Sequence, residues 1–263
     1  MRGTGRPLSD PLRRLGTVDL ALARLVEGHV NAALLMDVHG ERPAREAVRE
    51  CALLGVRGAD APDPLEWVDR AEGNGVASRA ASAMRLGWGT SRSGRFDAWG
   101  LVLDEAGSVG RAGDLMAEPW FEGGVGRTCA THVGGAEGLI ARRTEPRRRM
   151  ERLDDPVQSD RLGRALAEVA AAREAVDAAT DGDAAEVERA VAHGLPARQA
   201  VEGHCTRILA LCKRSLGMAA HGARGPVDRM RRDLSLFLRQ TAPDAKLNCA
   251  LATTRGVGIG NLR

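Results

Sequence analysis

The sequence predicts a mostly α-helical protein that has N-terminal helices, a reduced β insert and a C-terminal antiparallel helix bundle. Apolar residues recur at three- and four-residue steps before residue 55 and again after residue 119, as in amphipathic helices. Between residues 56 and 113 this period fades, and glycine, proline and short alternating stretches take its place. We therefore divide the chain into an N-terminal helical part (1–55), a β insert (56–113) and a helix bundle (114–263).

The N-terminal part is predicted to begin with a loose arm over residues 1–16. Thr17 then stands where a helix cap is expected, and the apolar residues Val18, Leu22 and Leu25 follow on one face. Gly40 is expected to end this helix. A second helix is predicted from about residue 43 to residue 54.

The β insert is identified mainly from one stretch. Residues 95–104 read RFDAWGLVLD, in which Trp99, Leu101 and Leu103 alternate with other residues. Period-two alternation is typical of a strand that buries one of its faces. The insert is therefore expected to contain short extended segments.

Four amphipathic helices are predicted in the C-terminal part. Asp155 is expected to cap the first of them, because a proline and then a glutamine follow it in the pattern of a helix start. The second is predicted over 183–194 and the fourth over 226–240, while Pro196 is expected to open the third. The arginine-rich segment 142–152 is interpreted as a solvated connection. Short connections between such helices favour an antiparallel bundle.

Composition excludes several classes of function. The chain is 43% hydrophobic and 28% charged, as in soluble globular proteins, and its net charge of +3 is too small to indicate a nucleic-acid partner. No segment approaches the run of about 18 apolar residues that a membrane span needs. The five cysteines form no CxxC pair, which favours a reduced cytoplasm over a disulfide framework. We expect a cytoplasmic protein that binds neither nucleic acid nor a membrane.

The order of several short segments resembles that of the acyl-CoA dehydrogenase-like flavoproteins of bacteria. They are similar to the first helix of that family, the turn into its barrel, its last hairpin, the return into its bundle and its final helix. In this chain they read LARLVEGHVNAA (22–33), LGVRGADAP (54–62), GWGTSRSGRFDAWG (87–100), EPWFEGG (118–124), RTCATHVGG (127–135) and RDLSLFLRQTAPD (232–244).

This resemblance implies an FAD-dependent oxidoreductase that acts on the CH–CH bond of an acyl-CoA thioester. In such an enzyme the flavin accepts a hydride, while the protein supplies orientation and a base. The family's cofactor-binding positions correspond here to Lys213 and Gly217, with Arg232 and Asp233 on the final helix. The resemblance also implies a homodimer or homotetramer.

The catalytic base is left open by the sequence. The place that corresponds to the family's glutamate on the final helix holds Gln240 and Thr241, and neither side chain is a carboxylate. Other members of the family carry the base on an earlier helix of the bundle. Glu137, Glu202 and Asp228 are therefore all candidates, with nothing in the sequence to choose between them.

Two departures from the family pattern suggest an alternative function. Only residues 63–86 separate the turn into the barrel from the last hairpin, and Arg57 stands where the family has a tryptophan. The alternative is a catalytically inactive helical scaffold, or a partner subunit of a full-length relative. No metal site is predicted, because His204 and His221 lack the spacing of metal ligands.

Overall fold

The computed structural model describes residues 6–50, 114, 124–149, 155–180, 187–221, 225–239, 247–248 and 251. These residues are mostly helical, as the sequence predicts. The main elements are α1 (Arg6–Val18), α2 (Leu20–His39), α3 (Arg42–Arg49), α4 (Val125–Arg149), α5 (Pro156–Thr180), α6 (Val187–Leu216), the 3-10 helix η4 (Gly217–His221) and α7 (Pro226–Phe237).

The chain forms two compact units. The first unit comprises residues 1–27 and 118–263, and the second comprises residues 28–117. The first contains α1, the opening turns of α2 and all of α4, α5, α6 and α7, and we call it the bundle. The predicted β insert (56–113) lies outside the described residues, so the division at residues 55 and 113 stays a prediction.

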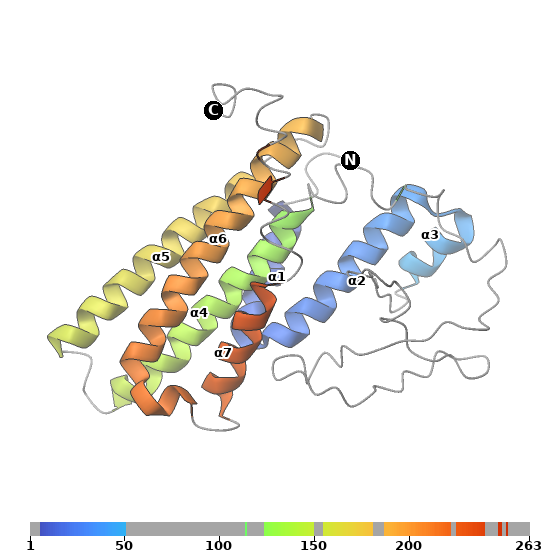
Figure 1. The fold of residues 1–263 in the computed structure, drawn as a ribbon. Coiled ribbons are helices and arrows are strands. Elements are labelled where there is room, and N and C mark those ends of the chain that lie inside the picture. Colours follow the sequence, from blue (N-terminus) through green and yellow to red (C-terminus); the bar gives the residue numbers. More distant parts are fainter. Residues whose placement is uncertain are drawn as a thin grey trace, which may run out of the picture. The chain divides into compact units, whose positions relative to one another are not determined.

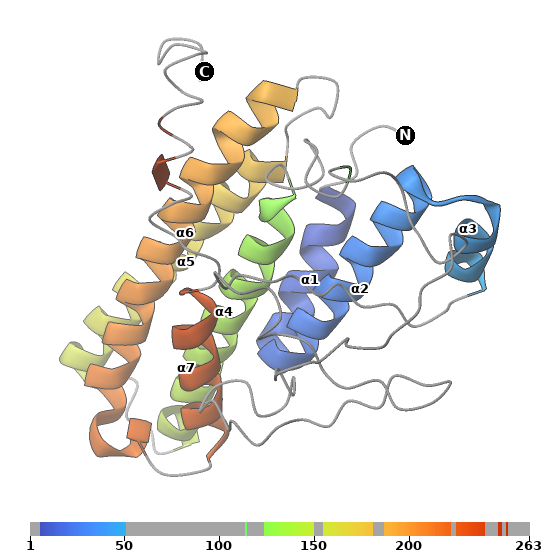
Figure 2. The same ribbon diagram turned by 45° about the vertical axis from the view of Figure 1, so that its right-hand side comes forward.

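Helix α4 is the centre of the bundle. It packs against α1, α5, α6 and α7, and α5 packs in turn along α6 (Figure 1; Figure 2). Arg143 near the end of α4 contacts Gln158 at the start of α5, whereas Gly126 at the start of α4 lies against Thr180 at the end of α5. These two helices are therefore antiparallel. From Gly126 to Ile140, all but two residues of α4 are buried.

Glycines allow α1 to lie very close to α4. A Cβ atom added at Gly16 would stand 2.7 Å from the carbonyl oxygen of Thr131. Cβ atoms at Gly134 and Gly138 would clash with the carbonyl oxygens of Arg13 and Thr17. The facing glycines thus bring the two backbones into contact, a packing that side chains at these positions would prevent.

The predicted loose arm over residues 1–16 is wrong from residue 6 onward, because helix α1 begins at Arg6, and residues 1–5 lie outside the described residues. Its sequence is charged and contains Pro11, which hides the helical signal. However, Ser9, Leu12 and Gly16 recur at three- and four-residue steps and are buried. Packing of this face on α4 therefore forms a helix that local propensity does not predict.

The start of α2 also differs from the prediction. Helix α1 continues through Thr17 to Val18, and Asp19 separates it from α2. The Asp19 carboxylate accepts a hydrogen bond from the backbone N–H of Leu22 (3.0 Å), so Asp19 caps α2 in place of Thr17. The predicted end at Gly40 is confirmed, since α2 ends at His39.

The predicted break at Gly194 and Pro196 is wrong, because α6 runs without interruption from Val187 to Leu216. An internal proline costs a helix about 3 kcal/mol. On either side of Pro196, Leu195 and Val201 are 2% and 0% exposed. Burying each such side chain contributes about 1.5–3 kcal/mol, so packing along α5 and α4 offsets the cost of the proline.

The start of α5 confirms its predicted cap. The carboxylate of Asp155 accepts a hydrogen bond from the backbone N–H of Gln158 (2.8 Å), with Pro156 as the first helical residue. Residues 142–149 are not the connection that was predicted, because α4 extends to Arg149, whereas residues 150–152 lie outside the described residues. Arg142 donates to the carbonyl oxygens of Thr17 (2.8 Å) and Val18 (2.5 Å) and so satisfies the end of α1.

Candidate functional site

Two of the four residues predicted to bind the cofactor lie at the end of α6. Lys213 is exposed in its last turn, and Gly217 follows the helix with a φ of 58°. That backbone conformation is open to glycine and strained for most other residues, and it is common just after a helix end. Gly217 therefore has a structural reason to be glycine. Its predicted contact with a cofactor stays a prediction.

The other two predicted residues are neighbours on α7. The Nε atom of Arg232 lies 3.1 Å from the carboxylate of Asp228. Asp233 is only 4% exposed, and burial raises its pKa to about 6. The charge of Asp19 acts in the same direction, whereas Arg229 and Arg232 oppose the shift. Asp233 is therefore a carboxyl group that changes its charge near neutral pH.

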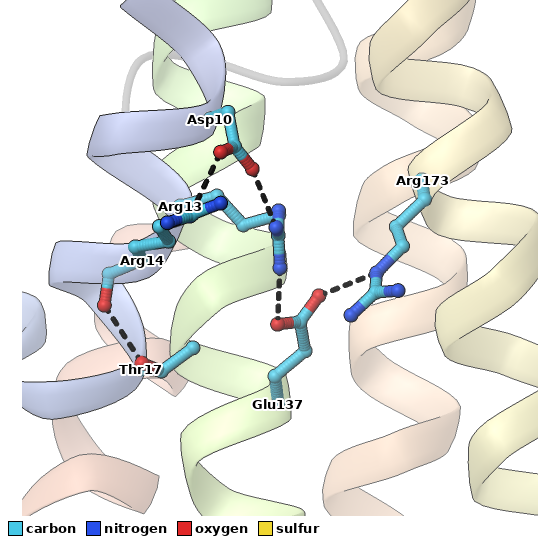
Figure 3. Close-up of polar contacts among 6 residues, drawn as sticks. All are labelled: Asp10, Arg13, Arg14, Thr17, Glu137 and Arg173. Carbon is cyan, nitrogen blue, oxygen red and sulfur yellow. Dashed lines mark hydrogen bonds and ion pairs between the residues drawn. The ribbon is translucent and has the colours of Figure 1, made fainter.

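The first candidate base, Glu137, lies on α4 between α1 and α5. Figure 3 shows its carboxylate between two guanidinium groups. One oxygen accepts a hydrogen bond from Arg13 (2.7 Å), and the other accepts from Arg173 (2.8 Å). Arg13 also donates to Asp10 (2.5 Å). Glu137 thus joins three helices through ion pairs.

The second candidate, Glu202, is buried on α6. One of its oxygens lies 3.3 Å from Arg198, which is one turn earlier on the same helix. The other oxygen lies 2.8 Å from Arg239, just after the end of α7. Glu202 therefore ties the end of α7 to the middle of α6.

The third candidate, Asp228, is buried in the first turn of α7. Its two oxygens lie 2.6 Å from Arg231 and 3.1 Å from Arg232. Arg231 also donates to the carbonyl oxygen of Ala220 in η4 (3.2 Å). In all three candidates, then, each carboxylate oxygen is ion-paired with a different arginine.

A further group of buried polar residues was not identified from the sequence. Glu27 on α2 is 2% exposed and accepts hydrogen bonds from Thr128 (3.0 Å) and from Arg24. Arg127 is buried nearby on α4, where burial lowers its pKa against the opposing charge of Glu27. Helical spacing explains why Glu27 and Arg24 share a face, but nothing in the sequence shows that α4 covers that face.

His132 lies on α4 and is buried. Burial lowers its pKa to about 3, and the positive charges of Arg198 and Arg24 act in the same direction. Its ring stacks on Phe237 of α7, with the ring centroids 6.4 Å apart and the planes inclined by 21°. His132 is therefore neutral at physiological pH and serves as a packed aromatic ring.

The buried thiols are unsuited to nucleophilic chemistry. Cys129, Cys205 and Cys212 are buried and form no disulfide bond. Burial raises the pKa of Cys129 to about 12 and raises that of Cys205 as well. Because the thiolate is the reactive form, a thiol with a raised pKa is a poor nucleophile at neutral pH.

His204, one of the two histidines considered as metal ligands, is paired with a carboxylate. The Nδ1 atom of His204 lies 2.5 Å from the carboxylate of Glu168 on α5, which also accepts a hydrogen bond from Arg207 (2.8 Å). Within the described residues, no group of three or more histidine, cysteine, aspartate and glutamate residues could hold a metal ion. None of the helices that the structure describes is long and apolar enough to cross a membrane.

Comparison with known proteins adds no functional assignment. A scan of protein-family models and a search of curated proteins found no match to this chain. The site must therefore be interpreted from its own geometry.

Proposed function

We propose that this chain is a helical scaffold or partner subunit, which acts by association, that Glu137 and Glu202 join elements of its bundle, and that Asp228 stabilises the first turn of α7. The observation that supports this proposal is the double pairing of each carboxylate. Each one has its two oxygens ion-paired with two different arginines. On this proposal, the chain resembles acyl-CoA dehydrogenases in the arrangement of its helices, and none of these three carboxylates acts as a catalytic base.

The chemistry of a general base explains why this pairing matters. A base must bring a carboxylate oxygen within hydrogen-bond reach of the proton that it removes. In Glu137, both oxygens already accept hydrogen bonds, from Arg13 and from Arg173. A substrate would have to displace an arginine and leave a largely buried charge without its partner. Breaking a buried ion pair in this way costs about 3–5 kcal/mol.

Unfolding experiments on carboxamide variants distinguish a structural role from a catalytic one. Glu137→Gln, Glu202→Gln and Asp228→Asn remove the charge and retain the shape. Asp160→Asn on α5 is the control, because its ion pair with Arg164 joins two exposed side chains. We expect each of the three variants to lose about 3–5 kcal/mol of unfolding free energy and the control to change little. Unchanged stability in all three variants would contradict the proposal.

A second candidate function is the FAD-dependent oxidation of an acyl-CoA thioester. The observation in its favour is Asp233, since a buried carboxyl group whose pKa is about 6 is suited to proton transfer near neutral pH. If Asp233 served such a reaction, flavin bound to the purified chain would be bleached by an acyl-CoA. Asp233→Asn would then abolish the bleaching while flavin remained bound. Bleaching that survives this substitution would exclude Asp233 as the base.

The same proposal includes a cytoplasmic location and self-association as a homodimer or homotetramer. Cys129, Cys205 and Cys212, which form no disulfide bond in the structure, favour the location, because cysteines outside disulfide bonds are typical of that compartment. The apolar side chains of Val18, Leu22 and Leu25 favour self-association. They lie three and four residues apart and are between 46% and 65% exposed.

A further inference from the structure

The junction between α1 and α2 is joined to α7 by a single aspartate. Asp19 lies between the two helices and uses one carboxylate oxygen to cap α2 through the N–H of Leu22 (3.0 Å). Its other oxygen accepts a hydrogen bond from Arg229 on α7 (2.8 Å). The two oxygens of Asp19 thus hold the start of α2 and the first turn of α7 at one place.

Asp233 lies one helical turn after Arg229, so the two side chains emerge on the same face of α7. Asp233 is almost completely buried, and it is close enough to Asp19 for the charges of the two carboxyl groups to interact. We call Asp19, Arg229 and Asp233 the junction cluster. It contains two carboxyl groups and one guanidinium, which is hydrogen-bonded to Asp19 and interacts electrostatically with Asp233.

Other charged groups surround the junction cluster. On α7, Arg232 acts on Asp233, although its Nε atom is paired with Asp228. From α4, Arg142 interacts with the charges of Asp19 and Arg229 while it donates to the end of α1. At the contact between η4 and α7, Arg231 is paired with Asp228 and donates to a backbone carbonyl oxygen.

We propose that the junction cluster is a proton-operated contact that secures α7 against the α1–α2 junction. When Asp233 is protonated, Asp19 is the one ionised carboxylate of the junction cluster, and its pair with Arg229 is undisturbed. When Asp233 is ionised, a second buried carboxylate competes for Arg229 and repels Asp19. The contact is then weaker, and the opening of α7 becomes more frequent.

The direction of the pH dependence follows from burial. In an open or unfolded chain the carboxyl group of Asp233 has an ordinary pKa of 3.8, whereas in the folded bundle its pKa is about 6. The folded state therefore retains a proton between these values that the open state has lost. The contact is strongest at acidic pH and weakens as the pH rises through 6. From pH 5 to pH 7.5, linkage gives about a tenfold increase in the opening constant.

Hydrogen exchange of the α7 amides in the full chain tests this proposal. After correction for the intrinsic pH dependence of exchange, we expect the protection of the amides of residues 229–237 to fall about tenfold between pH 5 and pH 7.5. Asp233→Asn should abolish the fall, and the control Asp160→Asn should retain it. Equal protection of the unmodified chain at both values, or a fall that persists in Asp233→Asn, would overturn the proposal.

A second measurement covers the case in which Asp233→Asn does not fold. The carboxyl carbon of Asp233 in the unmodified chain can be followed by NMR as the pH changes. We expect a titration midpoint near 6, together with chemical-shift changes in the Arg229 guanidinium over the same range. A midpoint near 4 would overturn the proposal, because the contact would then not change within the neutral range.

Discussion

At the scale of single residues, the bundle depends on ion pairs between buried carboxylates and arginines. Glu137 takes one arginine from α1 and one from α5, and Glu202 pairs with arginines on α6 and just after α7. A buried carboxylate left alone would cost several kcal/mol in lost hydration. These pairs therefore favour the observed neighbours among the helices. Because the carboxylate oxygens are paired with arginines, they are not available to act as a general base.

Asp233 gives the sharpest prediction at this scale. Its raised pKa means that its contribution to stability is fully present below pH 3.8 and is lost as the pH rises through about 6. Asp233→Asn should therefore increase the unfolding free energy at pH 7.5, by about 2–3 kcal/mol for a shift of this size. At pH 4 the change should be small. Urea unfolding at the two pH values measures the difference, and equal effects at both would contradict the assignment.

Helix packing at the scale of elements depends on the glycines between α1 and α4. A methyl group at Gly134 would clash with the carbonyl oxygen of Arg13, so Gly134→Ala should separate the two helices. We expect a loss of about 1–3 kcal/mol of unfolding free energy from this overpacking.

Gly163 provides the matched control for this prediction. It lies within α5, and a Cβ atom added there would have no neighbour within 4 Å. Because alanine is the better helix former, Gly163→Ala should stabilise the protein by about 0.5–1 kcal/mol. Thermal or urea unfolding of the two variants should therefore give changes of opposite sign. Stabilisation by Gly134→Ala would show that α1 does not pack on α4 as described.

The sequence predicts helix ends where the signal is local and fails where it depends on packing. The Asp155 cap and the end of α2 before Gly40 were predicted correctly, because the residues that form them are adjacent in the chain. Helix α1 and the continuous α6 were missed, since burial against α4 and α5 overrides the unfavourable prolines at 11 and 196. Neither packing contact can be identified from residues near each proline.

The candidate site shows the same limit. Its carboxylates were chosen from a resemblance, and the positions of Glu202 and Asp228 in helices were predicted correctly. The arginine partners of Glu137 could not be predicted in this way. Arg13 lies 124 residues from Glu137, and Arg173 lies 36 residues from it. No spacing rule joins residues so far apart, so the double pairing of Glu137 is visible only in the folded bundle. The partners of Asp228, in contrast, lie three and four residues along its own helix.

For the whole molecule, the proposed function predicts stable self-association. Sedimentation velocity of the purified chain should show a dimer or tetramer at micromolar concentration. Leu22→Glu should shift the distribution toward the monomer, because it places a charge among the exposed apolar residues of α1 and α2. Leu166→Glu on α5 is the control, since its side chain is exposed to a similar degree. A monomer at all concentrations would contradict this prediction.

The visible absorption spectrum of the full chain, after incubation with excess FAD and removal of free flavin, tests the central claim most directly. A scaffold that acts by association should retain no flavin, and its spectrum should show no visible band before or after an acyl-CoA is added. A retained flavin band that an acyl-CoA bleaches would contradict the account and establish the oxidoreductase.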